Sequence, residues 1–482
     1  MCLNRKANYE NSDMRRYLYI AFLLIILAAC GGGGGGGGGG GSPSSTVQTS
    51  TTPVATPSVT ISDLQDYPTT GNYDYGSDSI VFGKFGSKTA NCYLNQNITR
   101  GAQSLSNPSL PDAPTYVYCQ QTDGSFKEVR QQLFGQQLSV NGGYPLIADF
   151  NNDGIDDIFL KQSWDGYFTN DYFVYVLISK SDGTYSVNKI DSHAQSGVFG
   201  LTAIDINQDG CLDVVVSSLD FWKGDCTGNF TLTQNAFHYP QGLSVYQGEA
   251  ITSGDFLGKG YNQILITSSW KITPNNPNAV IDIDKNLNVL GVYPLPTPYF
   301  TATLGGGSED DAAVRVIDIN NDGKPDVVIN STNFFYTSDG RPSLTKMLVY
   351  LNTGNGNFTD ITATALPGFD TTLIGGFFNM RVLDLNGDGY LDLAFDGQTF
   401  GSGKDGNQVW INNRDNTFKP YFTTELDTLS NSFSSQFGPV AANTIGIILP
   451  IKVGNAWNYL IHVRDSHAQY HDGIANTQYT FK

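Results

Sequence analysis

Positive charge is scarce in this sequence, and that scarcity excludes one class of partner. Lysine and arginine together number 27 against 45 aspartates and glutamates, so the formal net charge is -18 and the pI is about 4.5. A surface of this sign repels nucleic-acid phosphates and anionic lipid headgroups. We therefore expect no nucleic-acid partner. Charged residues make up only 15% of the chain and glycine occurs 54 times, which favours a turn-rich β protein over a helical one.

Motifs of catalysis are also missing. The sequence has no H-E-x-x-H pair, no phosphate-binding P-loop and no G-x-S-x-G nucleophile motif. Three of the five histidines, His462, His467 and His471, lie near the C-terminus without the helical frame of a zinc site. Acid pairs suited to glycosidase chemistry cannot be recognised, because most clustered acids fall in the repeated loops described below. The sequence predicts a protein that is not an enzyme, with a polysaccharide lyase as the alternative.

Long hydrophobic runs are absent except at the N-terminus. Arg15 and Arg16 precede an apolar run over 17–29 that is too short for a stable membrane anchor, which is the layout of a secretory signal. The run ends in Leu-Ala-Ala-Cys30, which resembles a bacterial lipobox. That resemblance implies cleavage before Cys30 and acylation of its thiol. A plain signal peptide with an incidental cysteine is the alternative.

Three regions follow from this reading. Residues 1–29 are predicted to be a lipoprotein signal peptide, and residues 30–59 an acylated cysteine followed by a Gly/Ser/Thr/Pro-rich tether with no capacity for a core. The folded part is expected at 60–482. Gly31 after the lipidated residue resembles an outer-membrane address. We therefore expect a lipid-anchored protein of the bacterial cell envelope, at the outer membrane or cell surface, which touches the membrane only through its lipid.

Cysteine is rare, with six residues in all. Four of them remain after the signal segment and the lipidated position, and four thiols allow three pairings. No C-x-x-C spacing is present, which disfavours a zinc or thioredoxin-like site. Structural disulfides of an oxidising compartment are favoured. The pairing that is local in sequence joins Cys92 to Cys119 and Cys211 to Cys226.

A nine-residue pattern rich in aspartate recurs along the chain. Its first positions lie 56, 50, 63 and 66 residues apart, and a short apolar strand precedes and follows each copy. Strand-rich repeats of this length, punctuated by glycine, are typical of propeller blades. The four intact copies are DFNNDGIDD at 149–157, DINQDGCLD at 205–213, DINNDGKPD at 318–326 and DLNGDGYLD at 384–392, and a degenerate copy is DFLGKGYNQ at 255–263.

The intact copies carry the ligands that calcium prefers. Side-chain oxygens at positions 1, 3, 5 and 9 and the backbone carbonyl at position 7 supply hard oxygen ligands, and glycine at position 6 permits the tight turn. We predict about four calcium ions. The predicted ligands are Asp149, Asn151, Asp153, Ile155, Asp157, Asp205, Asn207, Asp209, Cys211, Asp213, Asp318, Asn320, Asp322, Lys324, Asp326, Asp384, Asn386, Asp388, Tyr390 and Asp392.

Two other interpretations of the loops were weighed. An EF-hand needs a bidentate glutamate at position 12, where this chain has apolar strand residues. Asx-type turns without metal are the second alternative, made less favourable by four copies in register. The degenerate copy has Lys259 at position 5, where an ammonium group replaces the expected ion. That copy is predicted to keep the turn and to hold no metal.

The loops, with the strand–turn–aromatic segments that follow them, resemble FG-GAP/VCBS repeat proteins, the propeller type also seen in integrin α subunits. The resemblance covers about 60–482 and implies an all-β propeller, with seven four-stranded blades expected and six or eight left open. It also implies calcium in each intact loop. It implies no single function, since family members include adhesins, lectins and non-catalytic parts of polysaccharide-degrading enzymes.

Aromatic residues follow the second strand of several repeats. Trp164, Trp222 and Trp270 lie beside polar or glycine residues in segments expected on the face opposite the loops. Such rings can stack on sugars or anchor a protein partner. Packing between blades is the alternative. The sequence thus predicts a surface-anchored binding module, adhesin- or lectin-like, for a carbohydrate or protein ligand on the cell exterior.

Overall fold

The computed structural model describes residues 60–66, 74–100, 115–138, 145–161, 173–191, 200–240, 248–268, 277–298, 309–333, 344–368, 380–395, 408–421, 447–464 and 470–479. Nearly all of them form strands, and the strands form seven four-stranded sheets. We call these sheets blades 1 to 7. All seven lie in one compact unit, which comprises Val59–Arg100 and Pro108–Lys482.

The first three blades take the chain from residue 74 to residue 233. Blade 1 contains β2 (Asp74–Gly83), β3 (Cys92–Arg100), β4 (Thr115–Gln120) and β5 (Phe126–Glu128). Blade 2 contains β6 (Pro145–Ala148), β7 (Asp157–Lys161), β8 (Phe173–Ser179) and β9 (Tyr185–Asp191). Blade 3 contains β10 (Leu201–Ile204), β11 (Asp213–Val216), β12 (Phe221–Gly224) and β13 (Phe230–Thr233).

The next three blades repeat the pattern. Blade 4 contains β14 (Gly248–Gly254), β15 (Gln263–Ser268), β16 (Ala279–Ile283) and β17 (Val289–Pro294). Blade 5 contains β18 (Glu309–Ile317), β19 (Asp326–Asn333), β20 (Leu344–Gly354) and β21 (Asn357–Asp360). Blade 6 contains β22 (Met380–Leu383), β23 (Asp392–Phe395), β24 (Gln408–Asn412) and β25 (Phe418–Tyr421). Two short helices, α2 (Arg130–Phe134) and α5 (Thr362–Ala365), follow β5 and β21.

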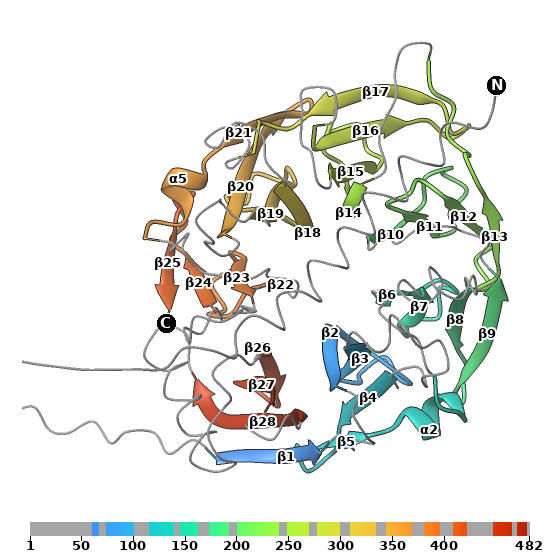
Figure 1. Ribbon diagram of the computed structural model, residues 1–482, viewed down its shortest axis with the longest axis vertical. Helices are drawn as coiled ribbons and strands as arrows, with labels where there is room; N and C mark the ends of the chain where they lie inside the picture. The colour runs from blue at the N-terminus through green and yellow to red at the C-terminus, as the bar shows by residue number, and fades with distance from the viewer. Residues whose placement is uncertain are drawn as a thin grey trace, which may run out of the picture. The chain divides into compact units, whose positions relative to one another are not determined.

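Blade 7 is built from both ends of the described chain. It contains β26 (Ile447–Val453), β27 (Ala456–Arg464), β28 (Tyr470–Tyr479) and, as its outermost strand, β1 (Thr60–Asp66). β1 pairs antiparallel with β28 from Thr60 opposite Asn476 to Asp66 opposite His471. This pairing closes the ring of sheets without a covalent link, and Figure 1 shows β1 lying along β28.

The blades pack face to face through apolar side chains. The second strands of blades 2 and 3, β7 and β11, are buried along their whole length, which explains the apolar runs at 158–160 and 214–216. One apolar cluster joins blade 5 to blade 6 and includes Val328, Met347 and Trp410. Another joins blade 7 to blade 1 through Leu449 and Tyr93. Burial between sheets therefore provides the main apolar stabilisation of the unit.

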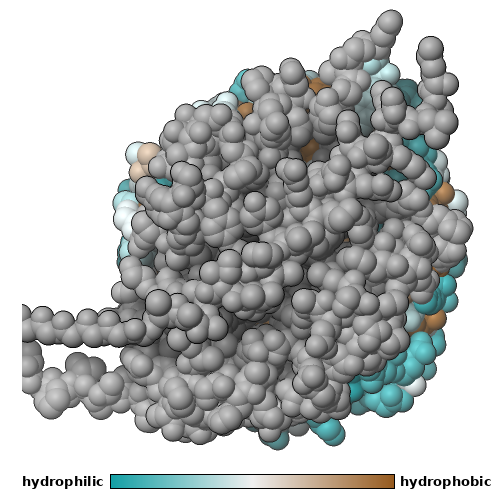
Figure 2. All heavy atoms as spheres, in the orientation of Figure 1, coloured by the Kyte–Doolittle hydropathy of each residue, from teal (hydrophilic) through white to brown (hydrophobic). Residues whose placement is uncertain are grey.

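First strands of successive blades also contact one another, from β2 and β6 through β10, β14 and β18 to β22. Figure 1 shows these strands at the centre of the ring and the fourth strands at its rim. The all-β class and the propeller of four-stranded blades are thus confirmed. Where Figure 2 shows described atoms at the rim, they are mostly hydrophilic. Among the described residues, Leu290 of β17 is a large apolar side chain that is exposed, at 54%. Among the described helices, none has the length and hydropathy needed to span a bilayer.

Candidate metal centres

The nine-residue loops occupy the same place in five consecutive blades. Each loop joins the first strand of its blade to the second, as 149–157 joins β6 to β7. We number the loops by blade, so loops 2, 3, 5 and 6 are the intact copies and loop 4 is the degenerate one, 255–263. Since the strand order is the same in blades 2 to 6, all five loops lie at the same end of their blades.

The backbone of each loop enters the left-handed region twice. In loop 2, Asn152 at position 4 has φ 60° and Gly154 at position 6 has φ 84°. The same two positions have positive φ in the other four loops. Glycine and asparagine tolerate this conformation, which explains the glycine at position 6. The sequence also carried the signal at position 4, where Asn152, Asn321 and Gly387 stand, and our reading of the sequence missed it.

Position 1 holds the turn together. In loop 2, the N–H of Asp153 donates to Asp149 Oδ1 at 3.0 Å, and the N–H of Gly154 donates to Asp149 Oδ2 at 2.7 Å. Asn151 Oδ1 at position 3 accepts from the same Asp153 N–H at 3.1 Å. Loops 3, 5 and 6 repeat these three hydrogen bonds at 2.9–3.1 Å. Asx-type turns, the alternative named above, are therefore present in all four intact loops.

Position 9 is a buried carboxylate. Asp326 is 0% exposed, and its two oxygens accept from the N–H groups of Ile319 at 2.9 Å and Asn352 at 2.7 Å. Burial raises the pKa of Asp157, Asp326 and Asp392 to about 6 and that of Asp213 to about 7, against the hydrogen bonds that lower it. A nearby cation would offset this cost of burying negative charge.

Position 5 carries a carboxylate, and in loops 3, 5 and 6 the chain places a cation beside it. The distance from Lys223 Nζ to Asp209 Oδ2 is 3.0 Å, that from Lys324 Nζ to Asp322 Oδ2 is 2.6 Å, and that from Arg414 Nη2 to Asp388 Oδ2 is 3.0 Å. In loop 2 the equivalent Asp153 Oδ2 accepts from Ser179 Oγ at 2.7 Å. Lys324 is position 7 of loop 5, where the sequence predicted only a carbonyl ligand, and its side chain was given no role. Lys223 and Arg414 had not been identified from the sequence, because they lie on segments with no fixed spacing from the loops.

Loop 4 balances its charges with side chains of blade 4. Position 9 is the neutral Gln263, which is 1% exposed, and position 5 is Lys259, whose Nζ forms an ion pair with the buried Asp282 of β16. Asp282 follows Ile281, the ladder partner of Ile264, and Lys223 follows Trp222, the partner of Val214, so the two residues hold matching places in blades 4 and 3. The ion pair of blade 4 is therefore that of blade 3 with its charges exchanged.

The donor set of the intact loops fits calcium in kind. Positions 1, 3, 5 and 9 offer only oxygen atoms, the backbone carbonyl of position 7 adds another, and a carboxylate oxygen that accepts one N–H keeps lone pairs for an ion. Within the described ranges, no three His, Cys, Asp and Glu side chains converge on a shared metal position. The amides and cations just described hold the carboxylates instead.

A family model described as FG-GAP-like repeat matches residues 331–395, which run from β19 through loop 6 to β23. Together with the ring of four-stranded blades, this match supports the resemblance to FG-GAP repeat propellers. The chain is a β-propeller that contains an FG-GAP-like repeat across blades 5 and 6.

The propeller is similar to several known proteins. It is 24% identical over 261 residues to a T-cell immunomodulatory protein homolog of Plasmodium yoelii yoelii, an alignment that covers 54% of this chain and only 30% of that protein. Among solved structures, the V. cholerae biofilm matrix protein Bap1 matches with TM-score 0.37 and 9% identity over 88% of this chain and 92% of that one. The Dos1 propeller matches with TM-score 0.37 and 9% identity, covering 83% and 95%.

Two hydrogen-bonded asparagines connect the loops of neighbouring blades. Asn412 of β24 donates through Nδ2 to the carbonyl of Ile319 in loop 5 at 2.8 Å, while its N–H donates to Asp392 of loop 6 at 2.8 Å. Asn352 of β20 makes the equivalent bonds to Phe256 of loop 4 at 3.0 Å and to Asp326 of loop 5 at 2.7 Å. Loops 4, 5 and 6 are therefore joined in a continuous chain of hydrogen bonds.

Both sequence-local disulfides are present. Cys92–Cys119 joins β3 to β4 in register, and Cys211–Cys226 joins position 7 of loop 3 to the turn between β12 and β13. Cys226 has φ 62°, and the same turn position is Gly354 in blade 5 (φ 102°) and Arg414 in blade 6 (φ 67°). This turn position thus contacts the loop of its own blade, by a disulfide in blade 3 and by an ion pair in blade 6.

The predicted aromatic surface requires a correction. Trp222 is 1% exposed, lies in β12 opposite Val214, and packs edge-on against Phe159 of blade 2 with ring centroids 5.5 Å apart. Its side chain belongs to the core between blades 2 and 3, so its assignment to a ligand surface is wrong. Trp164 and Trp270 lie outside the described residues, as do Cys30, His467 and the regions 1–29 and 30–59.

Proposed function

We propose that this FG-GAP propeller is a calcium-stabilised binding module for a glycan or protein partner, anchored at the bacterial cell envelope by a lipid on Cys30. One observation carries the calcium part. Four loops share the same oxygen-rich donor set and the same buried carboxylate at position 9, whereas the loop with a lysine at position 5 has a neutral residue at position 9. Where position 5 is a lysine, position 9 has lost its negative charge, and where position 5 is an aspartate, position 9 is a buried carboxylate. This is the pattern expected if the intact loops receive their positive charge from a bound ion.

The role proposed for calcium is structural. Bound ions would be held by the side chains at positions 1, 3, 5 and 9 and the carbonyl at position 7, and would supply the positive charge that offsets the crowded carboxylates. The chain's own residues would hold the loop in shape and link it to the rest of the blade. Position 1 fixes the turn, and position 9 links the loop to the third strand through the N–H of Ser179, Gly224, Asn352 or Asn412. Each loop would thereby fix the first three strands of its blade.

Binding without catalysis is the second part of the proposal. The shared architecture supports a binding module, and we propose a carbohydrate or protein ligand on the cell exterior. The experiment is a glycan array probed with the folded chain in calcium and in EDTA. Calcium-dependent retention on a subset of glycans supports the proposal, and no retention of folded protein in either condition removes the glycan part. Polyuronate substrates should release no unsaturated, ultraviolet-absorbing products, whereas such products would establish the lyase alternative.

The envelope anchor is tested separately. Replacing Cys30 with serine removes the thiol that would carry the lipid, so the protein should move from the membrane fraction of its host to the soluble fraction. An unchanged distribution would contradict the lipid anchor and leave the calcium proposal unaffected.

A further inference from the structure

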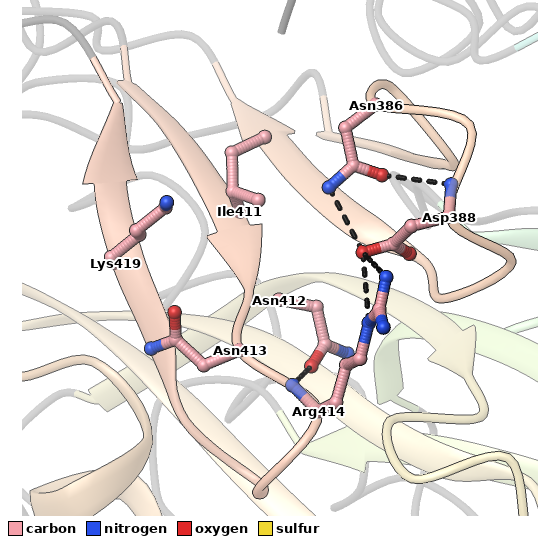
Figure 3. A pocket seen from close by; sticks show the side chains of 7 residues that line it. All are labelled: Asn386, Asp388, Ile411, Asn412, Asn413, Arg414 and Lys419. Carbon is pink, nitrogen blue, oxygen red and sulfur yellow. Dashed lines mark hydrogen bonds and ion pairs between the residues drawn. The ribbon is translucent and has the colours of Figure 1, made fainter. Parts of the chain in front are cut away.

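A polar pocket lies beside loop 6. It is a hollow of about 460 Å³ that is open to solvent, and it is lined by Asn386, Asp388, Ile411, Asn412, Asn413, Arg414 and Lys419. Figure 3 shows that loop 6 contributes Asn386 and Asp388, while β24, β25 and the turn between them contribute the other five residues. Except for Ile411, every lining side chain is polar or charged, so the pocket suits a hydroxyl-bearing ligand rather than an apolar one. We call it the blade 6 pocket.

Arg414 is placed in this pocket by an unusual backbone. Its φ is 67°, and its N–H donates to Asn412 Oδ1 at 2.7 Å in a turn that has Gly354 at the same position in blade 5. A residue with a Cβ is disfavoured in this conformation, whereas glycine adopts it freely. The turn therefore does not require arginine. The gain from arginine must lie in its side chain, which is 54% exposed and reaches Asp388.

Asp388 has two competing uses. Its Oδ2 accepts from Arg414 Nε at 3.1 Å and lies 3.0 Å from Arg414 Nη2, so both contacts of the guanidinium go to one oxygen. Asp388 is also position 5 of loop 6, a predicted calcium ligand. An ion that takes this carboxylate repels the guanidinium and competes for the same oxygen. This step rests on the proposed function, namely that loop 6 binds calcium.

Once separated from Asp388, Arg414 would stand in the pocket together with Lys419. No acidic side chain in the described part of the chain is paired with Lys419. The other polar side chains that line the pocket are the acid Asp388 and three amides. The amides are uncharged and cannot neutralise a cation. The released Arg414, which also lies 5.5 Å from the ring centroid of Tyr390, and Lys419 give the pocket positive charge that attracts an anion. The planar fork of arginine matches a carboxylate in a bidentate pair.

We propose that the blade 6 pocket binds the carboxylate of an acidic sugar, such as a uronic acid residue, and does so only when loop 6 holds calcium. Arg414 binds the carboxylate, and Lys419 on β25 adds positive charge to the pocket. Asn413 donates through Nδ2 to Thr417 Oγ1 at 2.9 Å, which leaves its exposed Oδ1 to accept from a ring hydroxyl. Calcium thus acts on the ligand indirectly, by removing Asp388 from Arg414. Blade 5 cannot do the same, because Gly354 carries no side chain at this position.

The test is calorimetric titration of the full chain with a tri-uronate oligosaccharide, in calcium and in EDTA. Binding is expected in calcium and at least about tenfold weaker in EDTA, and the carboxyl-reduced, neutral oligosaccharide should not bind in either. A sulfated neutral oligosaccharide of equal length separates a general anion site from a carboxylate site. Equal affinity for the neutral sugar, or preference for the sulfated one, overturns the assignment.

The matched variant is Arg414→Gly, which copies the turn of blade 5 and relieves its backbone. Uronate affinity should fall at least about tenfold, while calcium should bind loop 6 a few times more tightly, because its competitor is gone. Lys419→Ala, in a strand that keeps its ladder, should weaken uronate binding several-fold and leave calcium binding unchanged. A merely structural Arg414 would not produce opposite changes in the two affinities.

The two proposals fail in different ways. A wild-type chain that binds no calcium overturns both the calcium loops and this inference. Calcium binding to the wild type, with uronate affinity that is indifferent to calcium or to Arg414→Gly, overturns the inference alone and leaves the proposed function standing.

Discussion

Loops 4 and 5 lie in neighbouring blades, follow the same backbone course and differ in how they balance charge. In both, an aspartate at position 1 accepts from the N–H groups of positions 5 and 6, at 2.7 Å each in loop 4 and at 3.1 and 2.9 Å in loop 5. Loop 5 adds Asp322 at position 5 and Asp326 at position 9, where loop 4 has Lys259 and Gln263. The turn itself therefore needs only one aspartate and two residues with positive φ.

This difference separates architecture from ion binding. Loop 4 keeps the fold of the turn with no excess of negative charge, because its lysine pairs with the buried Asp282 and its position 9 is an amide. The intact loops concentrate three or four carboxylates in nine residues and bury one of them completely. Crowded acids of this kind destabilise a fold unless positive charge reaches them. We attribute that charge to calcium, and the predictions below test the contrast.

The largest expected effect is that of removing metal from all four intact loops at once. At a free calcium concentration of about 100 times Kd, each occupied loop adds about 2.7 kcal/mol to the free energy of unfolding. EDTA should therefore lower the melting temperature by on the order of 10 °C in a scanning calorimeter. An unchanged melt, with metal analysis proving that the ions are gone, would count against the calcium loops.

The next effect concerns loop 4 and should be independent of calcium. Lys259→Met removes the ammonium group but keeps the stem, which leaves the carboxylate of Asp282, 1% exposed, without its cation. Loss of about 3 kcal/mol in the free energy of unfolding is expected, equally in calcium and in EDTA.

The control for Lys259 is the charge-exchanged pair of blade 3. Lys223→Met breaks a pair whose side chains are 53% and 34% exposed, so its cost should stay below about 1 kcal/mol. Similar losses for Lys259→Met and Lys223→Met, measured by denaturant titration, would show that burial of Asp282 is not the source of the difference.

A third effect tests the hydrogen bonds between loops. Asn412→Ala leaves the carbonyls of Ile319 and Leu391 without their side-chain donor, and Asn352→Ala does the same to Phe256 and Pro325. Each variant should lose about 2 kcal/mol of stability. Only Asn412 joins two intact loops, so Asn412→Ala should weaken calcium binding at two sites and Asn352→Ala at one. Calorimetric titration with calcium distinguishes these results, and equal behaviour would contradict the coupling.

The smallest effect is a pH dependence whose direction calcium reverses. Without metal, burial raises the pKa of the position 9 aspartates from 3.8 to about 6 or 7. The folded chain then binds these protons more tightly than the unfolded chain does, so stability falls as pH rises from about 4 to 7. With calcium the carboxylates must be ionised, and stability should rise over the same window.

The control for this pH effect is Asp213→Asn, which removes one of the four groups. In EDTA, the free energy of unfolding of this variant should fall less steeply with pH than that of the wild type. The difference should be on the order of 1 kcal/mol across the window. Melts at several pH values would contradict the assignment if the slopes in calcium and EDTA have the same sign, or if Asp213→Asn leaves the slope unchanged.

The repeat spacing and the loop motif sufficed to predict the all-β propeller, because one strand–loop–strand unit recurs with its apolar strands intact. Both disulfides were predicted as the pairing local in sequence, and each is found inside one blade. Trp222 was misplaced because the connection after β11 is short. β12 begins at Phe221, only five residues after Val216, and carries the tryptophan into the core.

The partners of the loops could not be predicted in the same way. Lys223 and Arg414 reach Asp209 and Asp388 from the third strand and the turn after it, 14 and 26 residues further along the chain. No periodic pattern marks them, since the same turn carries cysteine, glycine or arginine in different blades. Only the pairing of the third strand with the second brings these residues to the loop.

The most direct test is a count of calcium ions per folded chain by native mass spectrometry, on the wild type and two position 1 variants. Four ions are predicted for the wild type, three for Asp318→Ala of loop 5, and four for Asp255→Ala of loop 4, where the turn aspartate changes but no ion binds. A wild-type chain without calcium, or loss of an ion from Asp255→Ala and none from Asp318→Ala, would contradict the assignment of metal to the intact loops.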